Sequence, residues 1–230
     1  EVMAGHENYD RETIGSSVSV RGQISPGKSL ELGNFSTVSE APASSTITKR
    51  VEGYFSRINY DLRSIYFLSA SFRRDGNSYF SADKRWANFW SIGGAWRISE
   101  EDFFKAPLIN ELKLKASYGK VGNDAVAPYS YQGGFSPNNN AQEPGYIHAA
   151  VANKNLTWES MDNFNAGIEF TLLKSRISGY VQYYNKNSSG LVFAVPQPLS
   201  DGGTPDGAFF VWQNIGSMYN RGLELSLTAA

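Results

Sequence analysis

Hydrophobic and polar residues alternate with a period of two over much of the chain, and helical periodicity is nearly absent. Successive side chains of a β-strand point to opposite faces, so each alternating run predicts a strand with one apolar and one polar face. The runs lie at residues 54–62, 66–74, 90–98, 111–118, 163–170, 177–184 and 223–228, with a first strand near 2–8. The pattern therefore predicts an all-β, antiparallel chain of about eight strands.

Several runs approach the ~9–11 residues that a tilted strand needs to cross a bilayer, whereas ordinary globular strands have about 5–6. If the apolar face meets lipid, its members include Leu68, Ala70, Phe72, Leu112, Leu114, Ile168 and Leu225. The inward residues are then Ser69, Ser71, Lys113, Glu169 and Glu224. The opposite register would place lysines in hydrocarbon, at a cost of about 2–4 kcal/mol each near the midplane.

The connections between the runs alternate between short and long. Residues 61–64 and 173–176 read as tight turns, and 99–110 as a longer connection in which Ser99 and Asp102 match a capping box for one helical turn that ends near Pro107. The long polar segments are 9–50, 75–86, 120–157 and 187–214. Transmembrane barrels sort their connections in this way, with short periplasmic turns and long extracellular loops, whereas a soluble sandwich has no reason to do so.

Composition narrows the class further. The chain has 13 Tyr, 14 Phe and 5 Trp, yet its mean hydropathy is only -0.37, as expected when only every second strand position is apolar. Rings near strand ends predict interfacial girdles; they are Tyr54, Tyr66, Trp86, Trp90, Trp96, Tyr118, Trp158 and Tyr183. With 21 basic against 22 acidic residues, the chain lacks the basic footprint of a nucleic-acid binder.

Catalytic and metal-binding patterns are not found in the sequence. His6 and His148 have no second ligand at metal spacing, and the chain has no cysteine. The acidic run Glu100–Asp102 is expected to solvate a turn, and Asp75-Gly76-Asn77 lacks the remaining ligands of a calcium loop. We therefore expect neither enzymatic activity nor a cofactor.

Several motifs recur in order along the chain, at residues 53–60, 66–76, 96–101, 112–119, 155–159, 183–186, 214–217 and 220–225. Taken together, they resemble the SusC/RagA family of TonB-dependent outer-membrane receptors, which is typical of Bacteroidetes. The loops at 9–50 and 125–150 do not share the resemblance. It implies a 22-stranded barrel in the Gram-negative outer membrane, with an N-terminal plug and a TonB-interacting segment.

The resemblance also implies import of glycans or peptides under a SusD-like lipoprotein. Residues 1–230 are then one part of the barrel domain, with two open sheet edges, and contain neither the plug nor the segment that contacts the TonB complex. The alternative is a secreted β-rich carbohydrate-binding or glycan-cleaving domain, which would share the aromatic richness and the long polar loops.

Two groups of residues are candidates for function. Arg57, Arg73, Arg97 and Glu169 fall on inward faces and could line a polar channel or touch the plug, although a ladder of ion pairs between strands is the favoured interpretation. Tyr129, Tyr131, Phe135 and Trp212 lie in two long aromatic loops, where rings suit sugar stacking or peptide contact. The loops also contain Tyr146, Phe209, Phe210, Asn138, Asn139, Asn140, Gln142 and Asp206. The rings could equally pack the loops together or contact the lid lipoprotein.

Overall fold

The structure, a computed structural model, describes residues 1–25, 27, 30–140, 143–201 and 209–229. Its strands are β1 (Val2–Gln23), β2 (Phe35–Leu62), β3 (Tyr66–Asn77), β4 (Trp86–Arg97), β5 (Ile109–Asn123), β6 (Gly134–Asn140), β7 (Glu143–Ala150), β8 (Glu159–Leu172), β9 (Ile177–Pro196) and β10 (Phe210–Ala229). Short 3-10 turns are η1 (Leu32–Asn34), η2 (Ile98–Glu100) and η3 (Leu199–Asp201). None of the described helices is long and apolar enough to span a membrane.

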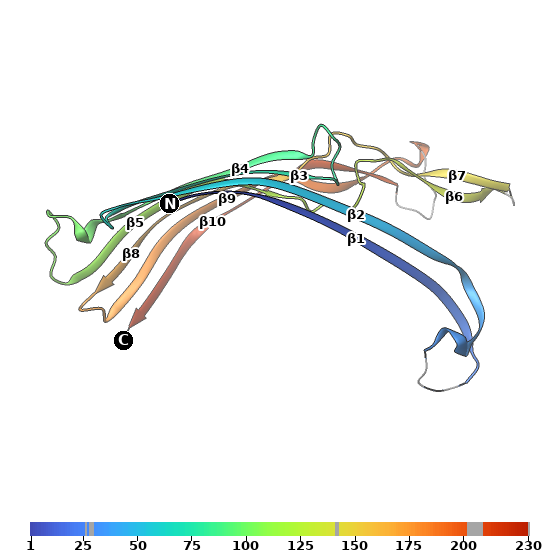
Figure 1. The fold of residues 1–230 in the computed structure, drawn as a ribbon, viewed down its shortest axis with the longest axis horizontal. Helices are drawn as coiled ribbons and strands as arrows, with labels where there is room; N and C mark the ends of the chain where they lie inside the picture. The colour runs from blue at the N-terminus through green and yellow to red at the C-terminus, as the bar shows by residue number, and fades with distance from the viewer. Residues whose placement is uncertain (26, 28–29, 141–142, 202–208, 230) are drawn as a thin grey trace. The chain divides into compact units, whose positions relative to one another are not determined.

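Eight strands form one sheet in the order β1-β2-β3-β4-β5-β8-β9-β10, and β6 pairs with β7 in a separate hairpin (Figure 1). The pairs described from β2 to β10 are all antiparallel. The predicted all-β, antiparallel class and the predicted number of strands in the main sheet are confirmed.

The strand register separates an apolar face from a polar face. One row of paired residues crosses the sheet from β2 to β10 as Tyr60, Leu68, Gly94, Ala116, Ala166, Tyr183 and Leu223. The adjacent row is Asn59, Ser69, Gly93, Ser117, Asn165, Tyr184 and Gly222. Paired residues share a face, so the predicted division of these residues between two faces is confirmed; which face meets lipid stays a prediction.

On each strand, the apolar face ends where a polar residue takes the next position on that face. On β5 it comprises Leu112, Leu114, Ala116 and Tyr118, and Lys120 follows. The first polar residues beyond the apolar face on β3, β4, β8, β9 and β10 are Arg74, Asn88, Asp162, Asn185 and Arg221. Four alternate positions cover about eight residues, or roughly 26 Å along a strand, which is comparable with the ~25 Å apolar band of outer-membrane barrels.

The two predicted tight turns are present. Arg63 and Ser64 have φ of 57° and 56°, and the Ser64 amide donates to Asp61 Oδ1 at 2.7 Å. Positive φ at both central residues suits a hairpin because the turn then follows the right-handed strand twist. The second turn likewise has positive φ at Leu173, Lys174 and Ser175.

Three of the predicted long loops were wrong in extent. Residues 9–50 belong mostly to β1 and β2, and Tyr9–Arg50 forms a compact unit distinct from the unit of Glu1–Asn8 and Val51–Ala230. Most side chains of the smaller unit are exposed. The parts of β1 and β2 within this unit have no buried apolar face, and their sequence therefore shows no alternation of apolar and polar residues. Similarly, 120–157 contains the β6–β7 hairpin, and β9 continues to Pro196.

The connection after β4 also differs from the prediction. A helical turn is present, but it is the 3-10 turn η2, with Arg97 as N-cap and no side-chain cap hydrogen bond. Ser99 therefore forms no capping box. Glu101 instead accepts hydrogen bonds from the Tyr66 hydroxyl and from Trp96 Nε1, the latter at 2.8 Å. These donors, Tyr66 first, hold the pKa of Glu101 below its ordinary value of 4.5.

Leu225 and Ser226 are adjacent on β10 but belong to opposite faces of the sheet, so a charge at each position should change the stability differently. In the whole protein, Leu225→Arg should lower the free energy of unfolding from lipid vesicles by about 2–4 kcal/mol, because the guanidinium would enter hydrocarbon. Ser226→Arg, which points to the polar face, is the control and should change it by less than about 1 kcal/mol. Urea unfolding in vesicles measures both. Equal losses in the two variants would contradict the assignment of the faces.

The Glu101 contacts predict a dependence of stability on pH. A lowered folded-state pKa stabilises the fold above the unfolded pKa, and this contribution is lost as the pH falls through the folded value. The whole protein should therefore be more stable than its Glu101→Gln variant at pH 7, and the difference should shrink below pH ~4.5. Unfolding midpoints at pH 7 and at stepwise lower pH measure this. A difference that stays constant with pH would rule out the proposed linkage.

Candidate functional site

The four residues predicted to face the lumen share the polar face of the sheet, and three of them form ion pairs. Arg97 Nε lies 3.3 Å from Glu111 Oε1. Glu169 contacts Lys115 and also lies 4.0 Å from Lys113 Nζ. These contacts form the cross-strand ladder of ion pairs that the sequence favoured.

Arg73 links strands that are not neighbours. Its Nη2 lies 2.9 Å from Glu7 Oε2 on β1, and its Nε lies 2.7 Å from Asp75 Oδ1 on β3. The guanidinium crosses β2 at Gly53, where a Cβ atom would lie 2.5 Å from Asp75 Oδ1 and 2.9 Å from Arg73 Nη2. Gly53 therefore provides the space in which this triad forms.

Arg57 differs from the other three. Its Nε donates to Asn59 Oδ1 at 3.3 Å, and no carboxylate of the described residues forms an ion pair with it. It is thus the member of the predicted group whose charge stays available on the polar face.

Between the charged groups, the polar face carries small uncharged side chains. Ser71 and Ser91 hydrogen-bond through their hydroxyl groups at 2.7 Å, and Gln182 Nε2 donates to Asn165 Oδ1 at 3.4 Å. A hollow of about 770 Å³ opens here, and Lys115 lies on its boundary. Other residues that line it are Asn59, Ser69, Gly93, Ser117, Asn165 and Gln182. The surface can hydrogen-bond a polar ligand or an adjacent segment of protein.

The long connections pack into a small core at the opposite end from the tight turns. Phe80 and Leu156 are fully buried. The Trp158 ring lies 5.5 Å from Phe80 and 5.4 Å from Phe89, and its Nε1 donates to the Arg85 carbonyl at 2.8 Å. Trp158 therefore belongs to this loop core, and its predicted place in an interfacial girdle was wrong.

Asn214 ties this core to the sheet. Its Oδ1 accepts from the Thr157 amide at 2.9 Å, and its Nδ2 donates to the carbonyls of Thr157 and Gly190, both at 2.8 Å. Gly190 has φ +65° and lies beside a register shift between β9 and β10. The amide group thus replaces backbone pairing where the ladder is interrupted.

Asn153 joins the loop of Tyr131 to Trp212, which lies in β10 and not in a loop as predicted. Its backbone amide donates to the Tyr131 carbonyl at 3.1 Å, and its Nδ2 donates to the Trp212 carbonyl at 2.7 Å. Two of the predicted ligand-contact residues, which are distant in the sequence, therefore share one anchor. The sequence did not predict a role for Asn153 or Asn214, although Asn214 is the first residue of the motif at 214–217.

The rings of Tyr129, Phe135 and Trp212, three of the four predicted ligand contacts, lie in separate ring pairs. Tyr129 lies 6.2 Å from Tyr79. Phe135 lies 4.5 Å from His148 and remains 66% exposed. The Trp212 ring packs at 5.5 Å on Phe210.

The remaining aromatic and polar candidates of these loops are placed only in part. Tyr146 is exposed, and Phe209 is buried at 6.3 Å from His148. Asn138, Asn139 and Asn140 belong to β6, and Gln142 and Asp206 lie outside the described residues. In the described part of the chain, no group of three or more carboxylates and imidazoles could hold a metal ion.

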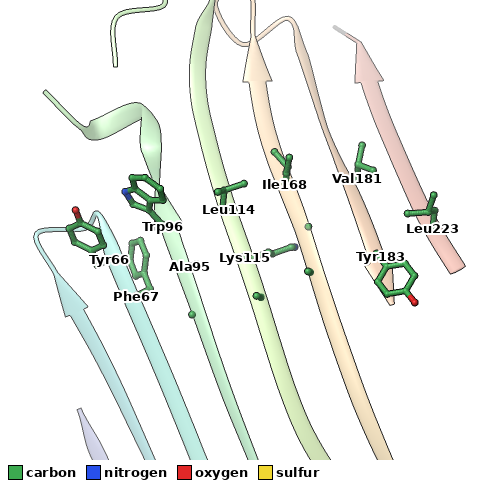
Figure 2. Close-up of a pocket in the computed structure, with 14 residues that line it drawn as sticks. Tyr66, Phe67, Ala95, Trp96, Leu114, Lys115, Ile168, Val181, Tyr183 and Leu223 are labelled. Carbon is green, nitrogen blue, oxygen red and sulfur yellow. The ribbon is translucent and has the colours of Figure 1, made fainter. Parts of the chain in front are cut away.

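A second hollow, of about 730 Å³, lies mostly among residues of the apolar face. Its small lining residues on the apolar face are Gly94, Ala116 and Ala166, neighbours in one row of the register. Figure 2 shows the larger side chains around it, among them Trp96, Leu114, Ile168 and Tyr183. The missing side-chain volume leaves a depression in an otherwise apolar surface.

Comparisons with known proteins agree with this architecture. Residues 6–230 match the family model described as TonB dependent receptor-like, beta-barrel. The chain is 37% identical over 187 residues to TonB-dependent receptor P39 of Formosa agariphila, covering 79% of this chain and 17% of that protein. It is 36% identical over 185 residues to TonB-dependent receptor SusC of Bacteroides thetaiotaomicron, covering 76% and 18%.

The structure is similar to that of the RagAB peptide transporter, with a TM-score of 0.86 and 28% identity over 99% of this chain and 25% of that one. The matched region thus spans about a fifth of the length of the curated relatives.

The hydrogen bonds of Asn214 predict a local loss of stability on truncation. Asn214→Ala should lower the opening free energy of residues 155–158 by about 2–4 kcal/mol, because three hydrogen bonds are lost and backbone groups of Thr157 are left unsatisfied. Amide hydrogen exchange of the whole protein measures this. Asn220→Ala, which loses one hydrogen bond from the Tyr184 hydroxyl, is the control. Unchanged protection at Thr157 would refute the anchoring role.

Proposed function

The chain belongs to the TonB dependent receptor-like β-barrel family, and on that premise we propose that it is a wall segment of a Gram-negative outer-membrane receptor that imports glycans or peptides. The observation that carries the proposal is the continuous division of the sheet into an apolar and a polar face across seven strands. In a membrane barrel the apolar face meets lipid and the polar face lines the interior.

The arrangement of the connections gives the segment a direction. We infer that the tight turns at 63–64 and 173–175 face the periplasm and that the loop core around Phe80 and Leu156 faces the outside, because barrels have short periplasmic turns and long extracellular loops. A ligand approaching from outside would first meet the aromatic loops and then the middle of the polar face. There Ser71, Ser91 and Gln182 offer hydrogen bonds, and the charges of Lys115 and Glu169 neutralise each other.

The partners follow from the family membership. SusC carries the name TonB-dependent receptor, and RagAB is described as a peptide transporter. By analogy, the whole receptor would work with the TonB complex, through segments outside these residues, and with a SusD-like lipoprotein over the extracellular loops. The ring-bearing loops suit sugars and peptides alike, so both ligand classes belong to the proposal.

A secreted carbohydrate-binding or glycan-cleaving domain is the weaker candidate. Such a domain would bury its apolar face in a core, but here Leu223, Leu225 and Leu227 are 65–75% exposed. Tyr60, Leu68 and Ile92 on the interior strands are also about half exposed. A face of this extent needs lipid or a partner protein to cover it.

The recognition role of the loops can be tested in the whole receptor with Trp212→Ala combined with Tyr131→Ala. If these rings contact the ligand, the Kd for the growth substrate should rise roughly 30-fold, equivalent to the ~2 kcal/mol of a strong interface contact. Uptake at low substrate concentration should fall in parallel.

Tyr60→Ala, which removes an exposed ring from the apolar face, is the matched control and should leave binding unchanged. Receptor abundance in outer-membrane fractions is measured for each variant. If abundance, binding and uptake all stay at wild-type values in the double variant, the loops are not the recognition surface.

A further inference from the structure

The basic residues on the two faces of the sheet have different partners. On the polar face, Arg73, Arg97 and Lys115 each form an ion pair with a carboxylate, whereas Arg57 and Lys186 form none with a carboxylate of the described residues. On the apolar side, Arg74, Lys120 and Arg221 form no ion pair with a carboxylate of the described residues. The positive charge on the outward side of the sheet is therefore not neutralised within this segment.

These three outward cations share one position relative to the apolar band. Each is the first outward residue beyond the band, after Phe72 on β3, after Tyr118 on β5 and before Leu223 on β10. All three lie at the end of the strands that carries the long connections. At strand spacings of about 4.8 Å, Arg74 and Lys120 stand on the order of 10 Å apart.

Aromatic rings accompany two of the cations. The Arg74 guanidinium lies 5.4 Å from the Trp86 ring centroid, and that of Arg221 lies 5.6 Å from the Tyr219 ring. Such contacts hold a cation beside apolar surface without neutralising it. Rings and cations at the edge of an apolar band are typical of a membrane interface.

Two carboxylates also lie at this level. Glu52 is occupied, since it accepts from the Tyr54 hydroxyl at 2.6 Å and lies 3.2 Å from His6 Nε2. Asp162 stands opposite Lys120 in the register, yet the two form no ion pair within 4.0 Å. The outward charge at this level remains positive.

The apolar hollow lies directly below the cations on the same strands. Ala116, on its floor, is four residues from Lys120 along β5, and Leu223, on its border, is two residues from Arg221. A lipid with its headgroup beside Lys120 would therefore have its chains over the row of Gly94, Ala116 and Ala166.

We propose that this outward surface is a binding site for an anionic, phosphate-bearing lipid of the outer leaflet. Phosphate oxygens accept hydrogen bonds from Arg74 and Lys120, and an acyl chain fills the depression, restoring the dispersion contacts that small residues leave unmade. The inference rests on the proposed outer-membrane location. A free phosphate ion would use the cations but not the hollow, and a neutral lipid would use the hollow but not the cations.

The test measures lipid A binding to the whole receptor in detergent, by native mass spectrometry and by the shift in Tm with lipid concentration. The headgroup variant combines Arg74→Gln and Lys120→Gln. Its control combines Arg57→Gln and Lys186→Gln, which remove two cations from the polar face. The chain variant is Ala116→Phe, and its control is Ala70→Phe, an outward position outside the hollow.

The headgroup variant should bind lipid A roughly tenfold more weakly, equivalent to about 1.4 kcal/mol, and the chain variant severalfold more weakly. Both controls should bind as the wild type does, and neither phosphatidylcholine nor inorganic phosphate should reproduce the wild-type binding. Equal binding by the headgroup variant and its control, or equal affinity for phosphatidylcholine, would overturn the proposal. Binding that follows inorganic phosphate alone would also overturn it.

Substrate uptake is measured with the same wild-type and variant receptors. If lipid A binding follows the expected pattern but the wild-type receptor imports no substrate, the proposed import function fails while the lipid site stands. If uptake is normal but lipid A binding does not distinguish the headgroup variant from its control, only the lipid site fails.

Discussion

Backbone pairing between strands, with side chains alternating between two faces, is the constraint on which the rest of the structure depends. A shift of one residue in any strand would exchange its apolar and polar faces. The described pairing is free of register shifts through the central apolar band; shifts occur near Ile109 at one end and around Asn214–Ser217 at the other. Lipid offers no hydrogen bonds to the backbone, so an unbroken ladder in the band is what a membrane segment requires.

This constraint also determines how charge is arranged on the polar face. Neighbouring strands bring Glu169 to Lys115 and Arg97 to Glu111, and the missing side chain of Gly53 lets Arg73 reach Glu7 two strands away. Neutralisation between neighbours leaves hydrogen-bonding Ser, Asn and Gln side chains, together with Arg57, between the ion pairs of the polar face. On the outward side, Arg74 and Arg221 stand opposite Asn88 and Asn185, and Lys120 stands opposite Asp162 without an ion pair within 4.0 Å.

At the end of the sheet that carries the long connections, regular pairing gives way to side chains that substitute for it. Asn214 pairs with both backbone groups of Thr157, and Asn153 holds the carbonyls of Tyr131 and Trp212. The buried Phe80 and Leu156 fill the space beneath. In the proposed receptor, these fixed contacts would lower the entropy lost when the exposed ring of Phe135 contacts a ligand.

The strands of the apolar band, their two faces and the tight turns could be predicted from the sequence. When one face of a strand is apolar, the alternation of apolar and polar residues is visible along the chain itself. The sequence also indicated the ion-pair ladder. Only the tertiary structure decided that residues 9–50 are largely β-strand, since a ribbon exposed on both sides has no hydrophobic period. It likewise placed Trp158 in the loop core and gave Glu101 and Asn214 their partners. Those contacts join residues up to about 73 positions apart, and no pattern along the chain encodes which distant carbonyl or ring will lie beside them.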